Sequence, residues 1–64
     1  MKSQIRALRE RVGMTRSQLS KASGVARATI WRLETAEDPI TTTSTLTKIA
    51  KALKVPVKEL FLPD

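Results

Sequence analysis

The stretch MTRSQLSKASGVARATIWRLE, residues 14–34, decides the fold, because it has the pattern of two short amphipathic helices joined through a glycine. Thr15 and Gln18 form a T-x-x-Q capping box, in which the threonine hydroxyl and the glutamine amide each pair with a backbone N–H at the start of a helix. Gly24 follows where the first helix must end, and glycine adopts the left-handed conformation of such a turn without a Cβ clash. The pattern predicts two helices that cross near a right angle.

The second helix of this pair has one apolar and one basic face. Val25, Ile30 and Leu33 recur at helical spacing and are expected to face the core. The face rotated toward solvent carries Arg27, Ala28 and Arg32.

A further helix is predicted before this pair, over residues 3–12. Ile5, Leu8 and Val12 stand at i, i+3 and i+7 and form its expected buried stripe, and Gly13 ends it. After the pair, the segment TAEDPITTT, residues 35–43, has the composition of a loop, because proline and a run of polar residues oppose helix continuation.

Two more helices are predicted in the C-terminal part. One spans about residues 44–54, with serine and threonine cap candidates before it. Pro56 opens the last one, a short fifth helix in which Val57, Leu60 and Phe61 recur at i, i+3 and i+4. The expected fold is therefore all-α, a compact five-helix bundle in a single domain over residues 1–64. The buried stripe of the fourth helix is Leu46, Ile49, Ala50 and Leu53.

Composition restricts the function classes. Twelve Lys and Arg against six Asp and Glu give a net charge of +6, which is typical of nucleic-acid binders. The chain has no cysteine and no histidine, so disulfides and thiolate zinc sites are excluded, and no cofactor is expected. It also lacks a glycine-rich phosphate loop and paired carboxylates, so we expect no enzyme and no small-molecule substrate. No apolar run has the length of a membrane span, and we expect a cytoplasmic protein.

Several residue groups stand together at characteristic spacing along the chain. They are Leu8-Arg9, Gly13-Met14-Thr15, Leu19-Ser20, Gly24-Val25, Thr29-Ile30 and Leu33-Glu34, followed by Leu46, Ile49, Ala50, Leu53 and Val55. At these positions the chain resembles the XRE family of helix-turn-helix regulators, the phage repressor and Cro type. The resemblance implies a lambda-repressor-like fold, with the helix-turn-helix as helices two and three, and double-stranded DNA as the partner.

The resemblance implies that the third helix enters the major groove and reads base edges. Arg27 is the leading candidate, because a guanidinium can donate two parallel hydrogen bonds to guanine O6 and N7. Ala28 permits apolar contact with a thymine methyl group. Thr29 can add a hydroxyl contact, and Arg32 can reach a base or a phosphate. Taken without the resemblance, exposed arginines on a short helix are equally well explained as solvated side chains.

Phosphate contacts are expected at two helix starts, where backbone N–H groups attract anions. Arg16 stands where the family usually has a glutamine that braces its partner on the third helix, and here the partner position is Arg27. Because two guanidinium groups repel, we expect each to need an acceptor on DNA, and the free face to be loosely ordered. Acids in the loop, Glu37 and Asp38, oppose contact with DNA there. The phosphate candidates are Thr15, Arg16 and Gln18 at the second helix, and Thr43 and Ser44 at the fourth.

Two residues inside the motif are expected to be structural. The resemblance implies that Glu34 pairs with Arg9 and joins the first and third helices. Trp31, the only tryptophan, lies about 100° around the helix from Ile30, and we expect it to pack against the protein rather than touch a sugar–phosphate edge.

A homodimer is expected, since one domain contacts few base pairs and a two-fold dimer reads two half-sites. Its expected interface lies at the C-terminal end, at Leu60, Phe61 and Leu62. The same apolar end could instead dock a protein partner, so an interaction module of the antitoxin kind, which binds DNA mainly for autoregulation, stays as the alternative to a repressor. A membrane-active basic peptide fits less well, because several apolar stripes separated by capping signals indicate a globular core.

Overall fold

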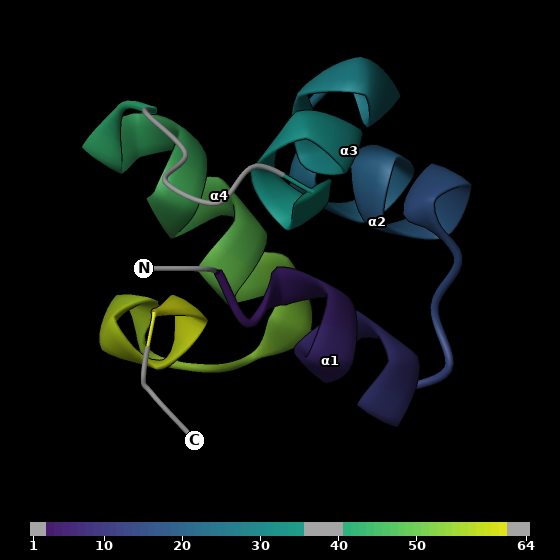
Figure 1. Cartoon of the computed structure of the whole chain (residues 1–64), viewed down its shortest axis with the longest axis horizontal. Helices are drawn as coiled ribbons and strands as arrows, with labels where there is room; N and C mark the ends of the chain where they lie inside the picture. The colour runs from purple at the N-terminus through teal and green to yellow at the C-terminus, as the bar shows by residue number, and fades with distance from the viewer. Residues whose placement is uncertain (1–2, 36–40, 62–64) are drawn as a thin grey trace.

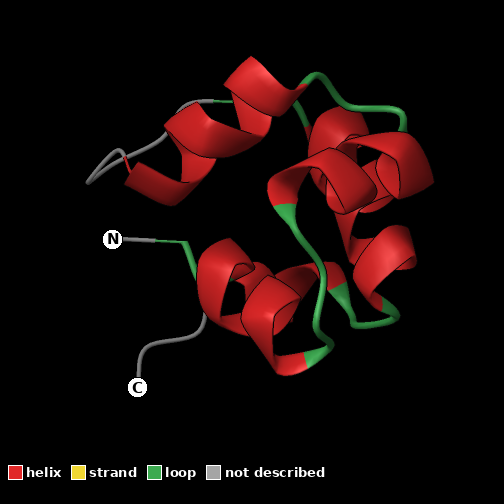
Figure 2. Cartoon of the chain, turned by 90° about the vertical axis from the view of Figure 1, so that its right-hand side faces the viewer, coloured by secondary structure: helices red, strands yellow, loops and turns green. Residues whose placement is uncertain are grey.

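Four α-helices and one 3-10 helix surround a single apolar core in the computed structural model, which describes residues 3–35 and 41–61 (Figure 1). Among these residues there is no strand (Figure 2), so the all-α prediction is confirmed. The five-helix count is met only if the short last element is included, because that element is a 3-10 helix. The helices are α1 (Ile5–Arg11), α2 (Arg16–Ser23), α3 (Arg27–Thr35), α4 (Thr43–Leu53) and η1 (Val57–Leu60).

The junction of α2 and α3 follows from its sequence. The backbone N–H of Gln18 donates to Thr15 Oγ1 at 3.1 Å, and the backbone N–H of Thr15 donates to Gln18 Oε1 at 2.8 Å, so both bonds of the capping box are present. Gly24 ends α2 with φ +76°, in the left-handed region, and its N–H donates to the Ser20 carbonyl. The predicted cap and the predicted turn are confirmed.

The first helix is shorter than predicted. It begins at Ile5 rather than Ser3 and ends at Arg11, before Val12. Ile5 and Leu8 are buried, but Val12 is 52% exposed, so its assignment to the buried stripe was wrong. The physical reason is that the helix stops and the chain turns at Gly13, after which Met14 packs against the core instead.

The C-terminal elements are set by capping. Thr42 Oγ1 accepts from the backbone N–H of Thr45 at 3.2 Å, which starts α4 at Thr43. Lys54 ends α4 with φ +60°, the one non-glycine residue of the described chain in the left-handed region. Pro56 then precedes η1, a four-residue 3-10 helix where a short α-helix was expected. Runs this short commonly take the tighter 3-10 form.

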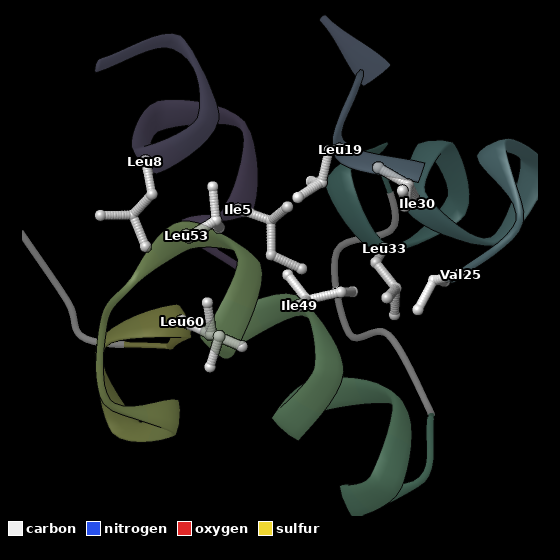
Figure 3. Close-up of a cluster of buried hydrophobic side chains, with 10 residues drawn as sticks. Ile5, Leu8, Leu19, Val25, Ile30, Leu33, Ile49, Leu53 and Leu60 are labelled. Atoms are coloured by element: carbon white, nitrogen blue, oxygen red, sulfur yellow. The ribbon is translucent and has the colours of Figure 1, made fainter. Parts of the chain in front are cut away.

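The core lies where all five elements meet (Figure 3). Figure 3 shows Ile49 and Leu53 of α4 beside Ile5 of α1. The motif residues Leu19, Ile30 and Leu33 lie on the right-hand side of the cluster in this view. Within the predicted stripe of α4, Leu46 is only half-buried and packs against the edge of this cluster. The fully or nearly fully buried apolar residues are Ile5, Leu8, Leu19, Val25, Ile30, Leu33, Ile49, Ala50, Leu53 and Leu60.

Two hydrogen bonds tie the start of the chain to distant elements. The backbone N–H of Gln4 donates to the Leu60 carbonyl in η1 at 2.5 Å. Ser3 Oγ donates to the Leu33 carbonyl in α3 at 2.6 Å. Ser3 and Gln4, just before α1, are thereby fixed to both the last described element and the second helix of the motif.

Candidate nucleic-acid interface

The outer face of α3 is basic and open to solvent. Arg27, Ala28 and Arg32 are exposed, and Thr29 is half-buried. On the opposite side of the helix, Ile30 and Leu33 are buried in the core. The predicted division of this helix into a core face and a basic outer face is confirmed.

A hollow of about 430 Å³ opens to solvent where the start of α2 lies beside α3. Its lining contains two arginines, one tryptophan and no acidic residue, so it combines positive charge with apolar surface. Such a surface suits a polyanion that also carries apolar groups. The lining residues are Thr15, Arg16, Ser17, Arg27, Ala28 and Trp31.

A buried carboxylate holds one wall of this hollow in place. The side chain of Glu34 has no exposed surface and receives hydrogen bonds from two arginines. Arg9 Nε lies 2.8 Å from Oε2 and Arg9 Nη2 lies 3.3 Å from Oε1, while Arg16 Nε lies 3.0 Å from Oε1. Arg9 also donates from Nη1 to the Met14 carbonyl at 2.7 Å. This cluster, Arg9–Glu34–Arg16, joins α1, α2 and α3, and it contains the ion pair that the resemblance implied.

The cluster changes the ionisation of its members. Burial by itself raises the pKa of Glu34, but the hydrogen bonds and charges of Arg9 and Arg16 outweigh burial, so the pKa of Glu34 lies below its ordinary value. The hydrogen bond to Glu34 raises the pKa of Arg9 further above its already high value. Glu34 and Arg9 are therefore both charged at neutral pH.

The expectation that Arg16 and Arg27 need DNA to find an acceptor was wrong. Arg16 is bound to Glu34, and Arg27 Nη1 donates to Ser17 Oγ at 3.2 Å. For Arg16 the reason is that the fold brings Glu34, in the last turn of α3, to the first turn of α2, where its carboxylate accepts from the guanidinium. No local signal marks this contact, because 18 residues separate Arg16 from Glu34.

The prediction that Trp31 packs against the protein was wrong. It is 53% exposed and lines the hollow together with Arg27 and Ala28. The signal that indicates this placement is its spacing: Trp31 stands at i+4 from Arg27 and i+3 from Ala28, which puts it on the outer face of α3 rather than on the face of Ile30.

The residues expected at phosphates lie at two separate helix starts. Thr15 and Gln18 are exposed at the start of α2, where the side-chain oxygen of each already accepts a backbone N–H of the capping box. Thr43 and Ser44 are exposed in the first turn of α4, and neither lines the hollow. Whether these side chains contact phosphate stays a prediction. Glu37 and Asp38 lie outside the described residues.

The apolar surface expected for a dimer is not formed as predicted. Leu60 is completely buried and belongs to the core, because η1 packs against α4. Phe61 is half-buried and packs against the same core, and Leu62 lies outside the described residues. Leu60 is therefore a core residue rather than a surface contact.

Neither a membrane-spanning helix nor a metal site is found among the described residues. None of the helices there is both long enough and apolar enough to cross a membrane. In the same residues, no three acidic, histidine or cysteine side chains gather as a metal site would require.

Comparison with known proteins agrees with this geometry. Residues 3–61 match the family described as a helix-turn-helix domain. The chain is 42% identical over 58 residues to the HTH-type transcriptional repressor RghR of Bacillus subtilis (strain 168), and the match covers 91% of this chain. It covers 43% of that relative, so the chain spans less than half of the relative's length.

Proposed function

Because the chain belongs to the XRE-type family of helix-turn-helix DNA-binding domains, we propose that it is a transcriptional regulator that represses by binding a specific double-stranded DNA sequence. The observation that carries this proposal is the outer face of α3, which is exposed, basic and continuous with a hollow that has no acidic residue. The relative from Bacillus subtilis is named as a transcriptional repressor, which supports repression over activation.

In the proposed complex, α3 enters the major groove and α2 lies across the backbone. Arg27 leaves Ser17 and donates two hydrogen bonds to guanine O6 and N7, since the bond to Ser17 at 3.2 Å is exposed and readily exchanged. Arg32 reaches a base or a phosphate one turn further along. Thr29 is half-buried, so its hydroxyl is limited to the edge of the contact.

Arg16 contacts a phosphate in this arrangement. Its side chain is 38% exposed and lines the hollow while its Nε is bound to Glu34, so a phosphate can approach the guanidinium from the hollow. Holding the guanidinium in place before binding lowers the entropy cost of forming the contact. Thr15, Gln18 and the start of α2 add donors for the same phosphate, and Thr43 and Ser44 offer hydroxyls for a second one.

Two copies are proposed to bind an inverted repeat as a homodimer. One α3 covers only a few base pairs, and two half-sites about one helical turn apart give a longer and more selective target. Because Leu60 is completely buried in the core, it takes no part in the proposed dimer interface.

The proposal is tested by selecting binding sites from random duplex DNA and then measuring affinity for the enriched site at several salt concentrations. An enriched inverted repeat is expected. Arg27→Ala should abolish the enrichment at one base per half-site. Arg6→Ala is the matched control, because Arg6 is exposed, pairs with Glu10 on α1 and does not line the hollow.

Steeply salt-dependent binding without any enriched sequence would contradict the proposal. That result would direct the search to a protein partner, as for an antitoxin-like interaction module.

A further inference from the structure

Trp31 is the one large apolar side chain of α3 that the core leaves exposed. Of the large hydrophobic residues in the described chain, only Trp31 at 53% and Val12 at 52% are exposed. Trp31 differs from Val12 in its surroundings, because it lines the hollow at the proposed DNA interface and Val12 does not. A solvent-exposed indole has an apolar face available for a ligand.

The position of Trp31 on α3 determines which side chains lie beside its indole. Side chains on a helix lean toward its N-terminus, so a residue covers the turn before its own Cα. Trp31 therefore leans toward Ala28 and Arg27, and all three line the same hollow. Ala28 contributes only a methyl group, so the indole and the Ala28 methyl form an apolar strip next to the Arg27 guanidinium.

The major groove offers one apolar group on its base edges, the C5-methyl group of thymine. A surface that joins an arginine to an apolar strip therefore matches a guanine with a neighbouring thymine. The charge of the hollow fits the same ligand, since Arg16 and Arg27 line it and no acid does.

We propose that Trp31 is a specificity-determining residue that contacts a thymine methyl group in the major groove, with Ala28 beside it on the same apolar strip. The inference rests on the proposed function and adds a base preference to it. Trp31 selects thymine over cytosine at the position beside the base read by Arg27, and it accepts 5-methylcytosine, which carries the same methyl group.

The test removes one methyl group from the DNA at a time. Each thymine of the enriched site is replaced singly by deoxyuridine, which keeps the base pair and loses only the C5-methyl group. The wild-type protein should bind about three- to fivefold more weakly at one thymine per half-site, which corresponds to the burial of one methyl group. Trp31→Ala should bind the thymine and deoxyuridine sites equally. Replacing that thymine by 5-methylcytosine should preserve more affinity than replacing it by cytosine.

Val12→Ala is the matched control, because it also shortens an exposed apolar side chain but lies outside the hollow. It should keep the full dependence on the methyl group. A measurement on the wild type guards against a variant that fails to fold: Trp31 is the only tryptophan, so its fluorescence should change when the specific site binds and should respond to deoxyuridine at the same position.

Each outcome decides the question. If no thymine-to-deoxyuridine change affects the wild type, or if Trp31→Ala keeps the dependence, the inference is overturned while sequence-specific binding stands. Equal weakening of all sequences by Trp31→Ala, with no effect of deoxyuridine, would overturn it in favour of a sugar–phosphate contact. Failure of the proposed function is distinct, because random DNA would then yield no enriched site at all.

Discussion

At the scale of single residues, Glu34 connects the fold to the proposed interface. Its carboxylate is fully buried, and Arg9 and Arg16 together occupy both of its oxygens. Of these two arginines, Arg9 is almost fully buried and Arg16 is partly exposed at the hollow. The residue that holds three helices together is thus also the residue that positions a candidate phosphate contact.

We expect Glu34→Gln to destabilise the protein by about 3 kcal/mol, because it leaves the buried Arg9 guanidinium without its counter-charge. Urea unfolding measures the change. Glu10→Gln is the control: Glu10 pairs with Arg6 on the exposed side of α1, and loss of an exposed pair costs less than about 1 kcal/mol. Equal effects of the two substitutions would show that burial of the pair does not matter.

Stability should fall in acid through Glu34. Its pKa is lowered in the folded protein, so near the ordinary carboxyl range the unfolded chain binds more protons than the folded one. The contribution of Glu34 is therefore complete above the ordinary value of 4.5 and declines as the pH falls below it. Thermal unfolding between pH 6 and about pH 3 should show this decline. In Glu34→Gln the decline should be smaller, whereas in Glu10→Gln it should be retained.

Arg16 and Arg27 should affect DNA binding differently although both line the hollow. Arg27→Ala should cost about 1–3 kcal/mol at its preferred base and little on other sequences, because a bidentate contact to guanine is lost. Arg16→Ala should weaken binding to all sequences and reduce the salt slope by about one charge. Titrations of specific and non-specific duplexes at several salt concentrations compare the two. Uniform weakening by Arg27→Ala would contradict its role as a base contact.

At the scale of elements, two helices end in the left-handed conformation, one at a glycine, which adopts it easily, and one at a lysine, which does not. Gly24 ends α2 at φ +76°, and Lys54 ends α4 at φ +60°. A Cβ at Gly24 would meet no atom within 4 Å, so a substitution there is opposed by backbone conformation and not by a clash. Lys54 already carries this conformational cost.

We therefore expect Gly24→Ala to destabilise the fold by about 1 kcal/mol, and Gly24→Val by more, because a β-branched residue resists positive φ. Lys54→Gly should act in the opposite direction and stabilise by up to about 1 kcal/mol. Thermal unfolding of the three variants tests the signs. Unchanged melting of Gly24→Val would contradict the turn geometry.

The elements differ in how far the sequence determines them. The capping box at Thr15 and the turn at Gly24 were predicted correctly, because both depend on residues a few positions apart. Val12 and the last helix were predicted less well, since periodicity does not show where packing ends. The Arg16–Glu34 bond had no local signal, because the two residues are 18 positions apart in the sequence and only the fold brings them together. The spacing of Trp31 from Arg27 indicates the outer face of α3. The prediction that Trp31 packs against the protein was wrong because it relied on the usual burial of tryptophan.

At the scale of the whole molecule, the first and last described elements, α1 and η1, complete one core. Leu60 of η1 is fully buried, and its carbonyl accepts from the backbone N–H of Gln4 at the start of α1. The core of the described residues is small, with ten buried apolar side chains, so each of them carries a large share of the stability.

Leu60→Ala should accordingly destabilise the protein by about 2–5 kcal/mol, the range for a fully buried leucine. Urea unfolding followed by circular dichroism measures it. Val12→Ala, at a residue 52% exposed, should change stability by less than about 0.5 kcal/mol. A small effect of Leu60→Ala would show that η1 is dispensable to the core.

The outer face of α3 has a consequence for engineering. Arg27, Ala28, Trp31 and Arg32 are exposed, whereas Ile30 and Leu33 hold the helix to the core from its other side. These four positions can therefore be randomised together as a library, with the scaffold left intact. Selection from such a library would retarget the domain to new operators, and the thermal stability of the selected proteins would stay near that of the parent.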